Sequence, residues 1–179
     1  APAVPAAHRP VMRDEALAAL GLRPGGCYVD ATFGRGGHAA RIHAALEGSG
    51  RLHLFDQDPE AIAVARALYG EAANVRIHAA NFASLAQALA DDVGRVDGIL
   101  IDLGVSSPQL DNAERGFSFS HDGPLDMRMN PSAGQSAAEW LAQAESDDIA
   151  DVLWRFGDER NSRRIARRIV ETRQTAPLT

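Results

Sequence analysis

The chain is most informative at residues 96–129, which read VDGILIDLGVSSPQLDNAERGFSFSHDGPLDMRM. A short apolar run at residues 99–101 predicts a strand buried on both faces of a parallel sheet. Asp102 follows at the carboxyl end of this strand, which is where open α/β sheets bind their ligands. Glycine, serine and proline then interrupt any regular period, and a loop of such length in a compact domain is usually functional. We therefore predict an active-site loop over residues 104–131.

Composition indicates an ordinary globular protein. The 179 residues are 45% hydrophobic and 23% charged, which suits one large domain or one domain with an insert. No apolar run is long enough to span a membrane. Residues 1–10 lack the segments of a signal peptide, so we expect a flexible tail there. The single cysteine, Cys27, excludes an internal disulfide and suits the reducing cytoplasm, where we expect the protein to act.

Charge is distributed unevenly along the chain. The net charge is −6, which taken alone argues against a nucleic-acid partner. Residues 154–173, however, carry seven arginines against three acidic residues, a net charge of +4, so the rest of the chain is −10. This asymmetry indicates a charged partner for one part of the surface.

The first part of the chain alternates between predicted helices and strands. Strands are predicted at residues 27–33, 51–56, 75–78 and 96–103. Helices are predicted at residues 14–20, after the glycine turn at 34–37, after an N-cap at Asp58-Pro59, and after a cap at Ser84. This order predicts an α/β fold with a parallel, doubly wound sheet and right-handed crossovers.

After about residue 135 the apolar spacing becomes helical and no further strand is predicted. A doubly wound sheet usually has more strands beside the fourth. We therefore expect the chain to be the N-terminal part of a longer protein. Its sheet domain would occupy residues 11–135, and residues 136–179 would begin an all-α insert.

The first strand-to-helix turn carries the features of a nucleotide site. Asp30 ends the strand, glycines follow, and a helix N-terminus offers free N–H groups. Asp56 ends the second strand, where an acid can bind both ribose hydroxyls of a nucleoside. A dinucleotide site remains an alternative, because Gly34, Gly36 and Ala39 match its G-x-G-x-x-G/A pattern.

Adenosylmethionine is favoured over a dinucleotide by the acids. Asp30 precedes the glycines and Asp102 follows the fourth strand, which suits a ligand with a cationic α-amino group and no pyrophosphate. Each residue also has a structural interpretation. Asp30 could only brace the glycine turn, His38 could be a surface residue of the first helical turn, and Phe82 could belong to the core rather than stack on an adenine.

Other polar side chains receive structural interpretations. Pairing within the long loop is expected among Arg115, Asp122, Asp126 and Arg128. The histidines show no metal-ligand spacing with cysteines or acids, so no metal site is predicted at His8, His43, His53, His78 or His121.

Several longer motifs resemble the bacterial MraW (RsmH) family of methyltransferases. They are DATFGRGGH (30–38), FDQDPEAI (55–62), DGILIDLGVSSPQLD (97–111), ERGFSF (114–119) and DGPLDMRM (122–129), with HRPVM (8–12) near the start. The resemblance covers residues 8–179. It implies a Rossmann-like class I methyltransferase sheet interrupted by a helical substrate-binding insert.

The resemblance also implies an activity and its site. Family members use S-adenosyl-L-methionine to methylate the N4 amine of a cytidine in the decoding centre of small-subunit (16S) ribosomal RNA. The substrate implied is therefore the 30S subunit or a precursor particle, with no membrane partner, and a homodimer is left open. Cofactor-contacting positions of the family fall on Gly36, Gly37, His38, Asp56, Phe82, Asp102 and Gln109.

Methyl transfer requires in-line positioning of the amine, and acceptors that hydrogen-bond its protons would assist. Our candidates for this catalytic role are Asp102, Ser106 and Ser107, although Asp102 could serve the cofactor alone. The target base must leave its stack to reach such a pocket. For binding RNA phosphates we select Arg163, Arg164, Arg167 and Arg168, with a solvated helix face as the alternative.

Two rival classes remain open, a dehydrogenase using the same glycine turn and a non-enzymatic RNA-binding module. The second would leave the acids at Asp30, Asp56 and Asp102 without a purpose. The fourth strand of residues 1–179 would lack a neighbour. We therefore expect this stretch expressed alone to be poorly soluble or to fold with reduced cooperativity, and to lack methyltransferase activity.

Overall fold

A computed structural model describes residues 12–178, and its contacts divide the chain into two compact units, Ala1–Gly104 and Val105–Thr179. The predicted tail and most of the HRPVM motif lie outside the described residues. All strands of the described chain belong to the first unit, and the second contains only helices and loops. The expected domain boundary near residue 135 stays a prediction.

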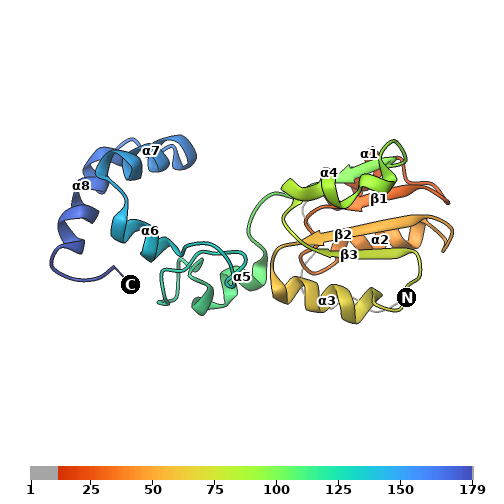
Figure 1. The fold of residues 1–179 in the computed structure, drawn as a ribbon, viewed down its shortest axis with the longest axis horizontal. Helices are drawn as coiled ribbons and strands as arrows, with labels where there is room; N and C mark the ends of the chain where they lie inside the picture. The colour runs from red at the N-terminus through yellow and green to blue at the C-terminus, as the bar shows by residue number, and fades with distance from the viewer. Residues whose placement is uncertain (1–11, 179) are drawn as a thin grey trace. The chain divides into compact units, whose positions relative to one another are not determined.

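The first unit is built on a four-stranded parallel sheet of order β3-β2-β1-β4. Its strands are β1 (Cys27–Asp30), β2 (Arg51–Asp56), β3 (Val75–Ala79) and β4 (Gly98–Leu100), which lie side by side in Figure 1. The predicted parallel α/β fold is confirmed. The first and last strands are shorter than predicted, since β1 ends at Asp30 and β4 covers only Gly98–Leu100.

Helices cover both faces of this sheet, because successive strand residues point to opposite sides. On one face Tyr28, Leu52 and Leu54 pack with residues of α1 (Arg13–Leu20), α2 (Gly37–Ala45) and α3 (Pro59–Tyr69). On the other face Val29 and Phe55 pack against Leu85 and Leu89, around the short helices η1 (Phe82–Ser84), α4 (Leu85–Ala88) and η2 (Ala90–Asp92). The sheet is therefore doubly wound.

The fourth strand is not buried on both faces, contrary to the prediction for residues 99–101. Ile99 and Ile101 are 47% and 48% exposed, and only Leu100 between them is buried. Burial on both faces was therefore wrong for the described chain, because β4 pairs with β1 on one side and lies at the sheet edge on the other. Leu103, at 74% exposed, extends the same apolar strip.

The predicted helix starts meet different outcomes. Asp58 caps α3 as expected, since its carboxylate accepts the Glu60 N–H at 2.9 Å and Pro59 opens the helix. Ser84 does not cap α4. Its hydroxyl donates to the Asn81 carbonyl at 2.8 Å, and the Asn81 side chain accepts the Ala83 N–H instead.

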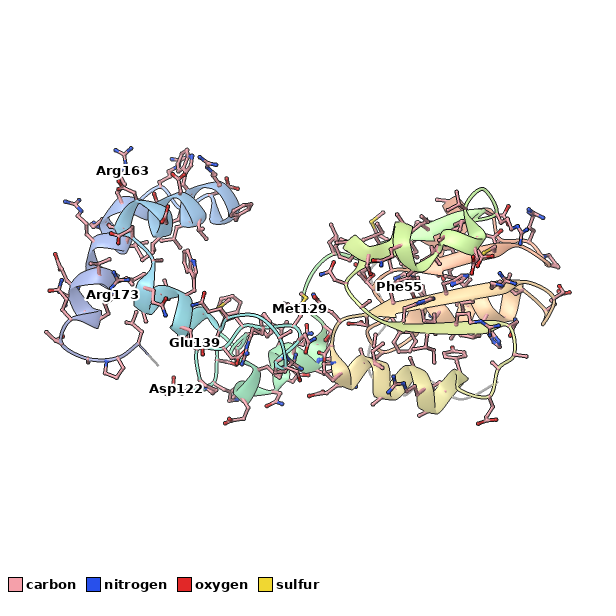
Figure 2. The ribbon with its side chains drawn as sticks, in the orientation of Figure 1. Phe55, Asp122, Met129, Glu139, Arg163 and Arg173 are labelled. Carbon is pink, nitrogen blue, oxygen red and sulfur yellow. The ribbon has the colours of Figure 1, made fainter. Side chains whose placement is uncertain are left out.

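The second unit begins with α5 (Ser107–Asp111) and η3 (Ala113–Arg115) and continues with α6 (Ala137–Gln143), α7 (Ser146–Gly157) and α8 (Ser162–Arg173). The helices expected after residue 135 are confirmed, and α5 shows that the long loop is partly helical. Ile149, Ala150 and Ala166 form the core between α7 and α8. Arg173 ties α8 to the end of α6 by donating to the Ala144 carbonyl at 2.7 Å (Figure 2).

A buried polar chain crosses β2 and β3 and should make stability depend on pH. His53 Nδ1 lies 3.0 Å from His78 Nε2, and His53 Nε2 lies 3.3 Å from Asp92 Oδ2. Burial lowers the pKa of His53 to about 4 from its ordinary 6.5, and His78 acts in the same direction. The unfolded chain therefore takes up this proton first as the pH falls.

The expected result is a loss of stability of up to about 3 kcal/mol from this site between pH 6.5 and 4, with the full contribution present above pH 6.5. Urea unfolding across this range would measure it. In His53→Gln the slope of unfolding free energy against pH should be shallower by up to about one proton. Equal slopes would contradict the assignment.

Candidate active site

The turn between β1 and α2 requires glycine at two positions. Gly34 and Gly36 have φ of 55° and 82°, in the left-handed region that other residues rarely adopt. A Cβ on Gly36 would also lie 2.9 Å from Cζ of the buried Phe33. The turn therefore stays close to the sheet and leaves the first N–H groups of α2, which begins at Gly37, without helical partners.

Asp30 lies beneath this turn and is completely buried. Its Oδ1 accepts the Thr32 N–H at 3.2 Å, whereas its Oδ2 has no hydrogen-bond partner within residues 12–178. Burial raises the pKa of Asp30 to about 7. Asp56 and Asp102 push it the same way, and the N–H groups of Thr32 and Ala39 oppose them. Bracing of the turn explains the bond at Oδ1, whereas the Ala39 N–H favours the ionised carboxyl without a hydrogen bond of normal geometry to Oδ2.

Asp56, at the end of β2, has a structural duty that the sequence did not reveal. Its Oδ2 accepts the Gly34 N–H at 2.8 Å, and its Oδ1 accepts the Asp58 N–H at 2.9 Å. The carboxylate thus holds the glycine turn against the start of α3. Each oxygen keeps a lone pair, so the predicted contact with ribose hydroxyls remains compatible with both bonds.

Asp102 and His38 are brought together across the sheet end. The Asp102 N–H donates to Thr32 Oγ1 at 2.8 Å, and Asp102 Oδ2 lies 3.7 Å from His38 Nε2. The surface interpretation of His38 was wrong, because only 6% of it is exposed. Burial lowers the pKa of His38 and Asp102 opposes this. His38 Nδ1 is buried without a hydrogen-bond partner among the described residues.

Phe82 follows β3 and is 36% exposed, so the core interpretation was wrong. Next to it, the Asn81 amide donates to Gln57 Oε1 at 2.9 Å, which joins the segments that follow β3 and β2. An aromatic ring is therefore available at the carboxyl end of the sheet. Its stacking on an adenine stays a prediction.

The remaining predicted residues belong to the second unit. Gln109 is buried, and its Oε1 accepts the Ser106 N–H at 2.9 Å at the start of α5, where Ser107 is the first helical residue. Gln109 therefore stabilises a helix start. Its cofactor contact, and the roles of Ser106 and Ser107 toward the amine, stay predictions.

The pairing expected within the long loop is confirmed for Asp126 and Arg128, whose Oδ2 and Nη2 lie 2.6 Å apart. The Arg128 guanidinium lowers the pKa of Asp126. Arg115 donates to the main-chain carbonyl of Met129 at 2.9 Å, which adds a tie across the loop. These bonds give the loop a fixed internal structure.

The described chain has neither a metal-binding cluster nor a membrane-spanning helix. Residues 12–178 contain no group of three or more His, Cys, Asp or Glu side chains that could hold a metal ion. Within the same residues no helix combines the length and apolar character needed to cross a bilayer.

A parallel doubly wound sheet, with a glycine turn after β1 and acids after β1, β2 and β4, defines a protein of the Rossmann-like α/β class. Within that class the chain belongs to the MraW methylase family, which matches residues 5–179.

Similar proteins carry one name. The chain is 59% identical over 174 residues to "Ribosomal RNA small subunit methyltransferase H" of Xanthomonas axonopodis pv. citri, covering 97% of this chain and 50% of that protein. It is 56% identical to the protein of the same name from Thioalkalivibrio sulfidiphilus, covering 96% and 55%. The chain thus spans about half the length of the curated relatives it matches.

Proposed function

We propose that the protein is an S-adenosylmethionine-dependent methyltransferase that acts on the N4 amine of a cytidine in the decoding centre of 16S ribosomal RNA. Family membership and the names of the relatives support the reaction class and the RNA. In this proposal the protein works in the cytoplasm on the 30S subunit or a precursor, and the described sheet supplies the cofactor site.

The observation that carries the cofactor assignment is the cluster of acids around the buried Asp30. The unpaired Oδ2 of Asp30 is buried, and Asp56 and Asp102 are close enough to raise the pKa of Asp30 further. Such a site attracts a cation and repels an anion. Adenosylmethionine carries an ammonium and a sulfonium, whereas the pyrophosphate of a dinucleotide is anionic. The acids therefore favour adenosylmethionine over NAD.

The chain's own residues would bind and orient the reactants. Bound adenosylmethionine supplies an electrophilic methyl group. Asp30 would pair with its ammonium, Asp56 with the ribose hydroxyls, and Phe82 with the adenine. The hydrogen bond from its N–H to Thr32 positions the backbone of Asp102, and its carboxylate is exposed. This carboxylate would accept an amine proton of the flipped base. Ser106 and Ser107 are further candidates for this role.

Calorimetric titration of the whole protein with S-adenosylmethionine, and separately with NAD, tests the cofactor. Mass spectrometry of small-subunit RNA after incubation then tests for a methyl group on cytidine N4. We expect binding of S-adenosylmethionine only, and methylation that Asp102→Ala abolishes or strongly slows. Binding of NAD alone would favour the dehydrogenase. Methylation of a different base or atom would overturn the substrate assignment.

A further inference from the structure

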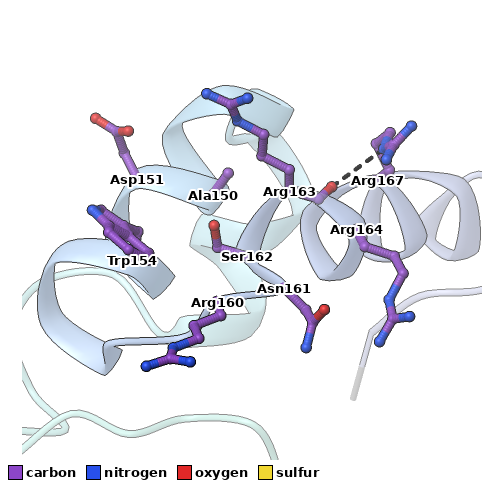
Figure 3. A pocket seen from close by; sticks show the side chains of 9 residues that line it. All are labelled: Ala150, Asp151, Trp154, Arg160, Asn161, Ser162, Arg163, Arg164 and Arg167. Atoms are coloured by element: carbon purple, nitrogen blue, oxygen red, sulfur yellow. Dashed lines mark hydrogen bonds between the residues drawn. The ribbon is translucent and has the colours of Figure 1, made fainter.

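The second unit contains a pocket that has no part in the methyl transfer proposed above. It lies at the turn between α7 and α8 and has a volume of about 480 Å³. Ala150 and Ser162, both buried, form its floor, and Figure 3 shows the other side chains arranged around them. Its lining consists of Ala150, Asp151, Trp154, Arg160, Asn161, Ser162, Arg163, Arg164 and Arg167.

The charge of this pocket is not neutralised locally. Its arginines are all exposed, and within residues 12–178 none of them forms an ion pair. The one acid in the lining, Asp151, already pairs with Arg155 at 2.9 Å. Arg168 points its charge elsewhere, since it lies 3.6 Å from Glu171 and does not line this pocket. The pocket is therefore an anion-attracting hollow on one side of α8.

Trp154 gives the pocket a flat apolar wall. This side chain is 56% exposed, although it lies on α7 beside the buried residues of the helical core. Arg167 Nε donates to the Arg163 carbonyl at 3.3 Å, which leaves its charge without an acidic partner. An exposed indole next to guanidinium groups that form no ion pair is the combination by which proteins bind single-stranded nucleic acid. Bases stack on the aromatic ring, and arginines bind the phosphates. The volume also falls within the range of about 300–1,000 Å³ common for small-ligand sites.

We infer that this pocket binds one unpaired nucleotide of the RNA substrate, with its base against Trp154 and its phosphate between Arg163 and Arg167. The inference rests on the proposed function for the identity of the partner. The inference reduces the set of four RNA-binding arginines selected from the sequence to three, because Arg168 does not line the pocket. A fixed nucleotide outside the target base would set the register of the RNA on the protein.

The test uses the whole protein and a short single-stranded oligoribonucleotide, with binding followed by anisotropy and tryptophan fluorescence. Trp154→Ala should weaken binding about tenfold, as expected for loss of one stacked base. Trp154→Phe keeps a ring, so its affinity should stay within about threefold while the fluorescence quenching is lost. Because Trp154 is exposed, neither change should unfold the protein.

The phosphate contacts are tested by salt dependence. Arg163→Ala with Arg167→Ala should reduce the slope of log affinity against log salt by about 1.4, since each lost single-strand phosphate contact removes about 0.7. Arg66→Ala is the control, because it removes an exposed arginine of α3 that does not line this pocket, and it should change affinity less than about twofold.

Unchanged affinity in Trp154→Ala, or equally tight binding of a duplex of the same sequence, would overturn the inference. The cofactor titration separates this failure from that of the proposed function. If the protein binds S-adenosylmethionine and methylates RNA, but Trp154→Ala leaves RNA affinity unchanged, the proposed function stands and only the nucleotide pocket is refuted.

Discussion

Asp30→Asn is expected to stabilise the ligand-free protein at pH 8 by up to about 4 kcal/mol while it weakens S-adenosylmethionine binding about 100-fold. Asp30 is buried with an unpaired oxygen, and its pKa is raised to about 7 by burial. Above pH 7, folding therefore buries an ionised carboxylate, which is unfavourable. The amide removes that charge and still offers an oxygen to the Thr32 N–H, but it cannot pair with an ammonium group.

The sign of this effect follows from the two pKa values. In the unfolded chain the Asp30 carboxyl titrates near its ordinary 3.8, and in the folded protein near 7. The folded state binds the proton more tightly, so Asp30 destabilises the protein increasingly between these values and fully above pH 7. Urea unfolding should show the gain from Asp30→Asn at pH 8 and none at pH 4.

Asp97→Asn provides the opposite control. Asp97 accepts the Cys27 N–H at 2.8 Å and pairs with Arg23, and these contacts lower its pKa. Removing that charge should reduce stability near neutral pH rather than increase it. If both changes stabilised the protein, a general relief of its negative charge would explain the result, and the specific assignment for Asp30 would fail.

Cofactor binding should carry the same signature. An ammonium group beside Asp30 favours the ionised carboxyl, so affinity should fall as the pH drops below about 7, by up to about tenfold per unit. In Asp30→Asn this dependence should disappear. Calorimetry at pH 6 and pH 8 measures both. A pH-independent affinity in the unchanged protein would show that the ammonium binds elsewhere.

The sheet could be predicted from the sequence because local signals agree there. The bounds of β2 match the prediction, since its apolar run is closed on one side by Gly50 and on the other by the Asp58-Pro59 helix start. The acids at strand ends could also be located, because the carboxyl ends of parallel strands share one edge.

Contacts between distant segments could not be predicted. The burial of His38 and the bond from Asp102 to Thr32 join residues far apart in the chain, and no spacing encodes them. The same holds for Asp56, whose two backbone partners depend on how the glycine turn folds back over β2. The predicted burial of Ile99 was wrong for a related reason, because the apolar run of β4 does not show which strands lie beside it.

The second large effect is expected for Asp56, which has a predicted contact with the ribose and two hydrogen bonds to the backbone. Asp56→Ala removes the acid predicted to bind the ribose hydroxyls, and cofactor affinity should fall by about 2–3 kcal/mol, or roughly 100-fold. It also leaves the N–H groups of Gly34 and Asp58 without their acceptor, so the unfolding free energy should fall by about 1–2 kcal/mol. Calorimetry and urea unfolding measure the two losses separately.

Asp58→Ala distinguishes ribose binding from support of the start of α3. This acid lies two residues further on and caps α3 through the Glu60 N–H, so its removal should cost about 1 kcal/mol of stability. Because Asp58 is buried beneath the helix start, cofactor affinity should remain within about threefold of the unchanged protein. If both variants lost affinity equally, the geometry of the turn would account for the loss, and Asp56 would not be the ribose ligand. A loss confined to Asp56→Ala excludes the helix start as its cause, because both variants weaken that start, and it leaves the ribose contact and the Gly34 N–H bond as the interactions that only Asp56 makes.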